Sequence, residues 1–88
     1  VKKDIVPFEP SAFDTLDQVE VVSFHYINDE TQADKVGFIA EDSPELVAGI
    51  NHDKMEMGNC IGLLIKAVQE LKQENKELRE IINGYKNA

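Results

Sequence analysis

The chain has 88 residues, of which 42% are hydrophobic and 30% are charged, and its formal net charge is −8. A chain this acidic repels nucleic acid and anionic lipid surfaces, so both are poor partners. A short chain leaves much of its surface in water, and the single Cys60 excludes an intrachain disulfide, so we expect association with other chains to stabilise the fold.

The first part of the chain predicts an extended segment followed by a short helix. Pro7 and Pro10 prevent a helix before residue 11, because proline lacks the backbone N–H that a helix interior needs. Ser11 is a favourable N-cap residue, and Asp14 stands where a capping box has its acidic partner. We therefore expect a short helix to begin just after Ser11.

The next segment predicts an antiparallel β-hairpin. Residues 19–27 and 35–40 are rich in β-branched and aromatic side chains, which favour strands. Residues 28–34 between them are polar and turn-forming, so we expect a seven-residue loop. Gly37 lies inside the second predicted strand, where a glycine indicates a bulge or the close approach of another backbone segment.

A second short helix is predicted after residue 42. Ser43 fits the N-cap position, Pro44 fits the first helical position, and the acidic Glu45 suits the first turn. Gly49 follows the last apolar residues of this segment and is a typical helix stop.

The segment after this second helix is predicted to connect it to a much longer helix. Residues 50–57 fit a short strand or an extended segment, and Gly58-Asn59 fits a break that caps the long helix. Residues 1–59 would then form a head of about three short strands and two short helices. This head holds four Lys against thirteen Asp and Glu, a charge of −9, whereas residues 60–88 hold five basic and four acidic residues, a charge of +1.

Residues 60–88 carry a heptad repeat, in which seven of the eight a and d positions are apolar or aromatic. The a positions are Ile61, Val68, Asn75 and Ile82, and the d positions are Leu64, Leu71, Leu78 and Tyr85. A 3.5-residue repeat keeps one narrow stripe towards a partner helix, so the pattern predicts a parallel coiled coil in which Glu74 reaches Arg79 of the neighbour. The alternative is a long amphipathic helix that lies on its own head. The head has too little apolar surface to cover about 36 Å of helix, the length of roughly 24 residues.

The repeat leaves the number of chains in the coil open. β-Branched residues at a together with Leu at d favour two chains. Ile65 at e, with Ala67 and Ile81 at g, instead widens the apolar stripe beyond a two-stranded seam. Asn75 is the polar residue of the seam, and we expect it to set the register, because a buried Asn tolerates only another Asn opposite it.

The sequence offers little support for a cofactor or a metal ion. His25 and His52 lie far apart, and neither has a second ligand at a metal-binding spacing. The glycines fit no phosphate-binding loop, and the adjacent Glu41 and Asp42 precede a helix start, where a solvated turn is the usual structure. We predict no cofactor and no metal site.

Three segments resemble a known family. Residues 37–42, followed by Pro-Glu-Leu-Val at 44–47, resemble the Gly-Phe-Ile-Ala-Gln/Glu-Glu … Pro-Glu-Leu-Val signature of the endosialidase-type C-terminal intramolecular chaperone domain. The six residues of this motif are Gly37, Phe38, Ile39, Ala40, Glu41 and Asp42. Residues 61–71 are similar to the family's helix start, and residues 1–5 are similar to the end of its opening motif, Ser-Asp-x-x-Leu-Lys-x-Asn/Asp-Ile.

The resemblance implies a function. Domains of this family end phage tailspikes, tail fibres and neck appendages, where they trimerise the precursor, direct its folding and then cut themselves off. The opening Ser is the nucleophile and a Lys five residues later is its base, which places the base at Lys2 and the Ser four residues upstream of Val1. Because that Ser is absent from these 88 residues, we expect either the released product or a form that cannot cleave itself. The resemblance also implies the infected bacterial cytoplasm during virion assembly as the location, and absence from the mature virion.

We therefore predict an α+β fold, with a small head (1–59) and a long helix (60–88) that forms a parallel trimeric coiled coil, the two parts unfolding as one cooperative unit. The expected partners are two further copies of the chain and the upstream fibre or appendage segment, with no nucleic acid and no membrane. Two alternatives stay open. The first alternative is a coiled-coil oligomerisation module without chemistry. The second is the equivalent self-cleaving domain of a membrane-tethered transcription factor.

Overall fold

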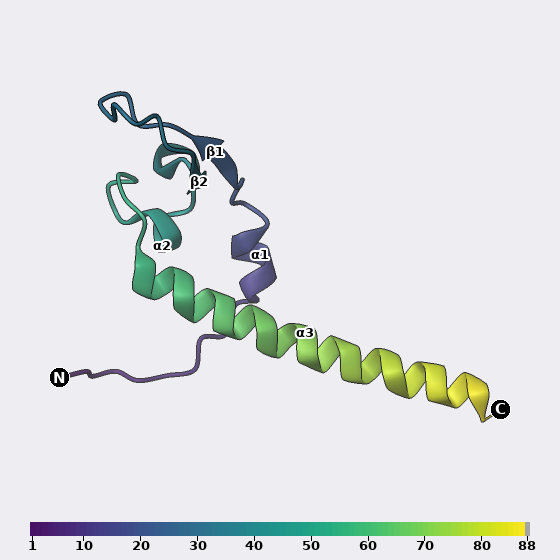
Figure 1. Ribbon diagram of the computed structural model, residues 1–88. Coiled ribbons are helices and arrows are strands. Elements are labelled where there is room, and N and C mark those ends of the chain that lie inside the picture. The colour runs from purple at the N-terminus through teal and green to yellow at the C-terminus, as the bar shows by residue number, and fades with distance from the viewer. Residues whose placement is uncertain (88) are drawn as a thin grey trace.

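The computed structural model describes residues 1–87 and shows an α+β fold with short elements followed by one long helix (Figure 1). The elements in chain order are α1 (Ala12–Leu16), β1 (Val22–Phe24), β2 (Lys35–Gly37), the 3-10 helix η1 (Ala40–Asp42), α2 (Glu45–Ala48) and α3 (Met57–Lys86). The molecule is elongated, with extents of 62 × 37 × 21 Å. None of the helices described in residues 1–87 is long and apolar enough to cross a membrane.

Helix α1 begins where the sequence predicts it. Ser11 is the N-cap residue in an extended conformation, and its side-chain oxygen accepts a hydrogen bond of 3.2 Å from the backbone N–H of Phe13. This bond satisfies one of the N–H groups that a helix start leaves without a partner. The N-cap prediction is confirmed.

The hairpin is confirmed as an antiparallel pair, but its strands are shorter than predicted. β1 and β2 pair with Val22 opposite Gly37 and Phe24 opposite Lys35, so three residues of each strand are in register. No third strand joins them in the described part of the chain. A two-stranded ribbon is barely stable in water, and the polar tip between the strands turns through local hydrogen bonds instead of extending the ladder.

The prediction of a bulge or close backbone approach at Gly37 is wrong. Gly37 pairs directly with one residue of β1, and a Cβ added to it would meet the Phe24 ring at 3.5 Å, an ordinary contact. The predicted strand 35–40 ends at Gly37 because the chain turns there into η1. The buried Ser43 holds this turn, since its hydroxyl donates to the carbonyl oxygen of Ile39 at 2.8 Å.

The second short helix is present, with a different start. The N-cap of α2 is Pro44 rather than Ser43, whose hydroxyl is bonded to the preceding turn. Gly49 ends the helix as predicted, with φ of 85° and ψ of 163°. Only glycine adopts this backbone conformation without strain.

Of the two alternatives predicted for the segment after α2, the strand is wrong. Residues 50–52 complete a turn, residues 53–56 are irregular with a bend at Lys54, and the backbone N–H of Glu56 returns to the carbonyl oxygen of Val47 at 2.7 Å. Helix α3 begins at Met57 with Glu56 as its N-cap, so Gly58 and Asn59 lie inside its first turn and do not cap it. The backbone N–H groups of His52, Lys54 and Glu56 bond to Gly49, Ala48 and Val47, so the segment folds back on the end of α2.

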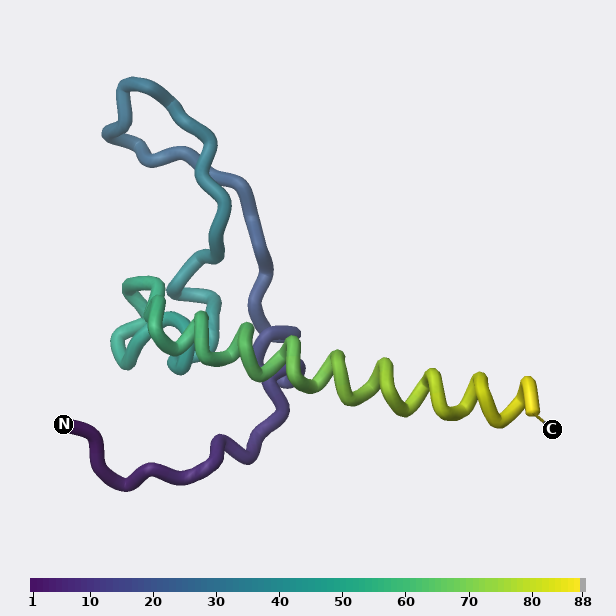
Figure 2. Tube along the Cα trace, turned by 60° about the horizontal axis from the view of Figure 1, so that its bottom comes forward, coloured from purple at the N-terminus to yellow at the C-terminus, as the bar shows by residue number. Residues whose placement is uncertain are grey.

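The core lies where α1 and α2 pack on the first half of α3. The buried hydrophobic residues of the described chain are Ala12, Val47, Ala48, Leu63 and Ala67. Three of these five are alanines, so the core is small. The second half of α3 projects beyond the head, and residues 1–10 form an extended N-terminal arm that leaves α3 on the side opposite to the hairpin (Figures 1 and 2).

Candidate functional site

The predicted coiled-coil seam forms an exposed stripe along α3. Its seven apolar or aromatic members are each 50% to 82% exposed in the single chain. They are Ile61, Leu64, Val68, Leu71, Leu78, Ile82 and Tyr85, and the polar Asn75 is exposed among them. Large apolar side chains in a continuous exposed stripe indicate a surface that another protein covers.

The head packs on a different face of the same helix. Leu63 and Ala67 are buried against α1 and α2, and Leu63 lies about 130° around the helix from the centre of the seam, taking about 100° per residue. The first half of α3 therefore lies on its own head, as the alternative interpretation held, but it does so without using the seam. The assignment of Ala67 to a widened seam is wrong, because this side chain belongs to the core of its own chain. Ile65 and Ile81 are exposed and free to widen the stripe.

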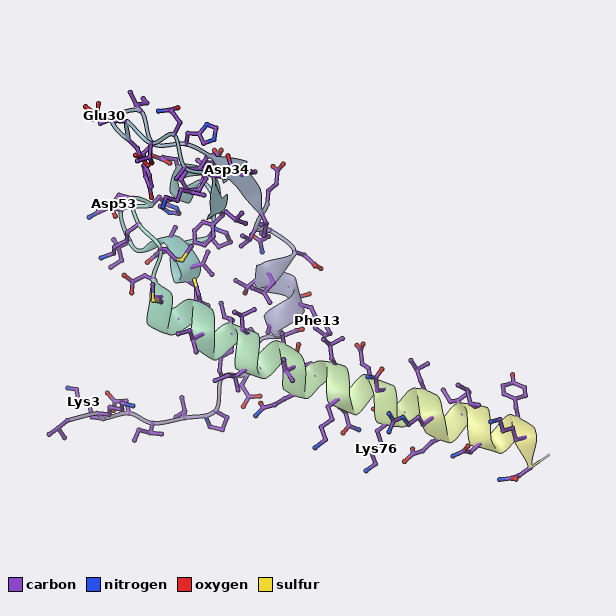
Figure 3. The ribbon with its side chains drawn as sticks, viewed as in Figure 1. Lys3, Phe13, Glu30, Asp34, Asp53 and Lys76 are labelled. Carbon is purple, nitrogen blue, oxygen red and sulfur yellow. The ribbon has the colours of Figure 1, made fainter. Side chains whose placement is uncertain are left out.

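The proposed base, Lys2, lies near the free end of the N-terminal arm. All ten residues of the arm are exposed, including the apolar Val1, Ile5 and Val6. Figure 3 shows the neighbouring Lys3 on the arm, away from the head. A single chain therefore does not bury Lys2, and it leaves the apolar Val1, Ile5 and Val6 largely exposed.

The arm and the start of α1 are each attached to α3 by a contact that sequence reasoning missed. The carboxylate of Glu70 accepts hydrogen bonds from the Ser11 hydroxyl at 3.1 Å and from the Ala12 backbone N–H at 3.0 Å. One turn earlier on α3, the Lys66 ammonium donates to the Phe8 carbonyl oxygen and lies 5.0 Å from the centroid of the Phe8 ring. The spacing of Lys66 and Glu70, four residues apart, places both on one face of a helix, but no signal in the sequence identifies their partners 58 or 59 residues away.

The two histidines make hydrogen bonds within the head. His25 Nε2 lies 2.5 Å from a carboxylate oxygen of Asp34, which joins the two ends of the hairpin loop. His52 Nδ1 lies 2.8 Å from the carbonyl oxygen of Ser43. Within residues 1–87 no cluster of three or more His, Cys, Asp or Glu side chains could hold a metal ion.

Two groups have shifted pKa values. The hydrogen bonds from the Thr31 hydroxyl and backbone N–H lower the pKa of Asp29, which fixes the tip of the hairpin loop as a charged turn. Burial raises the pKa of the Cys60 thiol, and the nearby Glu56 adds to the effect. Cys60 lies at the edge of the core, with its sulfur 3.8 Å from the Val47 carbonyl oxygen.

A comparison with protein families matches residues 1–50 to the family described as chaperone of endosialidase. The chain belongs to this family. The match covers more than half of the chain, and it includes the arm, α1, the hairpin, η1 and α2. Comparisons with curated proteins and with solved structures give no match.

Within the chaperone of endosialidase match, the Gly37–Asp42 motif joins the hairpin to the core. Gly37 ends β2, Phe38 packs against the buried core residues, and Ala40–Asp42 form η1. The charged Glu41 and Asp42 are exposed, as expected for a solvated turn. These residues position α2 against α3, and so their role in the single chain is to build the head. The matched residues end before α3, which carries the seam.

Proposed function

We propose that the chain is a C-terminal intramolecular chaperone, which trimerises a phage fibre or appendage precursor, directs its folding and leaves it by serine–lysine self-cleavage just upstream of Val1. The observation that carries the proposal is the exposed seam of α3 on a helix whose other face already holds a family-typical head. The partners are two further copies of the chain and the precursor segment that precedes it. Assembly would take place in the cytoplasm of the infected bacterium.

The projecting half of α3 supports self-association. Residues 71–87 are exposed on every side, and Figure 3 shows Lys76 on this half, beyond the head. An isolated helical segment of about this length is marginal in water, because most helical stability in proteins comes from packing of an apolar face. A trimer suits the stripe better than a dimer, since the exposed Ile65 and Ile81 flank the a and d residues.

The proposed cleavage also requires neighbours. A serine hydroxyl is a poor nucleophile until a base takes its proton, and a lysine becomes a base near neutral pH when it is moved out of water. The exposed arm gives Lys2 no such environment in one chain. A cleft between subunits would supply it, so cleavage would follow correct assembly.

Sedimentation equilibrium of the chain tests the assembly. We expect a single species with the mass of three chains at micromolar concentration. A mass of two chains would contradict the trimer, and a mass of one chain at all concentrations would contradict the seam as an interface.

Cleavage of a precursor that carries the upstream Ser tests the chemistry. We expect Lys2→Ala to abolish cleavage, while the matched Lys3→Ala change on the next residue leaves the rate unaltered. Leu71→Asp would bring three carboxylates together at the centre of the seam and should abolish both assembly and cleavage. A monomeric Leu71→Asp precursor that still cleaved at the normal rate would refute the dependence of cleavage on assembly.

The exposure of Lys2 gives one specific reason to keep the alternative of a coiled-coil module without chemistry. In that case the wild-type precursor would trimerise and stay intact, and Lys2→Ala would behave like the wild type. The equivalent domain of a membrane-tethered transcription factor would show the same cleavage, with a different upstream chain.

A further inference from the structure

We propose that Lys66 and Glu70 are positioning residues for self-cleavage, because they hold the base of the arm in one register along α3 and thereby fix the point from which the exposed segment that carries Lys2 extends. This inference rests on the proposed function. It concerns residues of α3 that lie outside the family match and outside the seam.

The two contacts together define a register. Lys66 and Glu70 are four residues apart, which is about 6 Å along the helix. Their partners on the arm side, Phe8 and the Ser11–Ala12 pair, are three to four residues apart in a chain that spans at most about 3.5 Å per residue. Because both ends of this short stretch are tied to one helix face, the arm cannot slide along α3 without breaking one contact.

The chemistry of each contact is specific. Glu70 serves two donors at once, and one of them is the backbone N–H of Ala12, which is fully buried. Lys66 binds Phe8 both through the backbone carbonyl oxygen and through the face of the ring. Lys66→Met therefore frees the arm without touching the core, whereas a substitution of Glu70 also leaves the buried Ala12 N–H without its acceptor.

Lys66 and Glu70 lie on a different face of α3 from the seam. Lys66 lies about 170° and Glu70 about 130° around α3 from the centre of the seam, taking about 100° per residue. Neither residue would lie in the a/d seam of a trimer. The arm register and the trimer contact can thus be changed independently.

The arm leads from these contacts directly to Lys2. Residues 2–7, between Phe8 and the end of the arm, are all exposed. The Phe8 contact is therefore the last fixed point before the proposed base. Loss of this fixed point would let the segment that carries Lys2 start from many positions, so Lys2 would reach the reacting geometry less often and the rate would fall.

The test uses the trimeric precursor that carries the upstream Ser. Lys66→Met should slow cleavage by about two- to fivefold while the trimer mass and the melting temperature stay at wild-type values. Lys66→Arg keeps a donor and a cation over the Phe8 ring and should restore most of the rate. Lys76→Met, on the exposed second half of α3, is the matched control and should cleave like the wild type.

A second variant reports on the arm through another group. Glu70→Ala removes the acceptor of the Ala12 N–H, so exchange of that amide with solvent should accelerate about tenfold or more, and cleavage should slow together with it. Wild-type cleavage rates for both Lys66→Met and Glu70→Ala in an intact trimer would overturn the inference. Loss of the trimer in Lys66→Met would also overturn it, because Lys66 would then support the fold instead of the arm.

The controls distinguish this inference from the proposed function. If the wild-type precursor stays intact, or if Lys2→Ala cleaves normally, the proposed function itself is wrong. If the wild type cleaves, Lys2→Ala does not, and the two α3 variants cleave normally, the proposed function holds and the positioning role alone is wrong.

Discussion

The adjacent residues Leu63 and Leu64 allow the folding of the head to be separated from the assembly of the coil. Leu63 is 4% exposed and belongs to the core, whereas Leu64 is 55% exposed and belongs to the seam. The two side chains have the same size and lie on the same helix, about 100° apart. Replacing each with alanine therefore removes equal volumes from two different surfaces.

The exposure of each leucine gives the free energy that its replacement by alanine should remove. Leu63→Ala leaves a cavity in a small core and should cost about 2–5 kcal/mol per chain. Full burial of a leucine contributes about 1.5–3 kcal/mol, so the 55% of Leu64 that a neighbour could still cover contributes about 0.8–1.7 kcal/mol. Three Leu64→Ala changes in a trimer would together remove about 2.5–5 kcal/mol of association free energy. That loss would lower the association constant by roughly two to three and a half powers of ten.

Sedimentation equilibrium over a dilution series, combined with thermal unfolding, measures both effects. Leu64→Ala should move dissociation of the trimer to higher concentration and should recover wild-type stability when the concentration is raised. Leu63→Ala should lower the unfolding temperature even at the highest concentration. An association constant for Leu64→Ala equal to that of the wild type would refute the seam as the assembly surface.

Three further changes test individual residues. Asn75→Ile should raise thermal stability and loosen oligomer specificity, because it removes the one polar group that the proposed trimer would bury in the seam; a less stable variant that stays a single species would contradict this account. Gly49→Ala should lower the free energy of unfolding by about 1–3 kcal/mol, because alanine is strained at a φ of 85° and a ψ of 163°. Gly84→Ala, in open space on α3, should raise it by about 0.5–1 kcal/mol. Equal melting temperatures of the two variants would contradict both expectations. The Cys60 thiol, whose pKa is raised by burial above the ordinary value of 9.0, should react with a thiol reagent at pH 7 more slowly than free cysteine and should accelerate as pH rises past that value.

Local signals in the sequence predicted the elements whose causes are local. The Ser11 cap, the Gly49 stop and the antiparallel hairpin each depend on a few adjacent residues, and the structure confirms them. The apolar period of α3 likewise identified an exposed stripe with its residues.

The errors arose where distant contacts decide the structure. The long predicted strands stop after three residues because no further strand covers them, and residues 50–56 bond back to α2 instead of extending. Ala67 fits a seam by spacing, but α1 and α2 bury it. The arm contacts of Lys66 and Glu70 join residues 58 or 59 positions apart, which a periodic pattern cannot reveal.

On the proposed function, helix α3 would link folding, assembly and the position of the arm, because a different face of the helix would serve each of them. The head contributes few buried residues larger than alanine, so its own core stabilises α3 only weakly. Binding of neighbouring chains to α3 would therefore also stabilise the surface on which α1 and α2 pack. The same step would fix Lys66 and Glu70, and with them the arm. On the proposed function, Lys2 would then reach its working position after the trimer had formed and not before. After the domain is released, the fibre could not refold by the pathway that the domain had directed. The lifetime of the folded fibre would then depend on a slow unfolding rate as well as on its equilibrium stability.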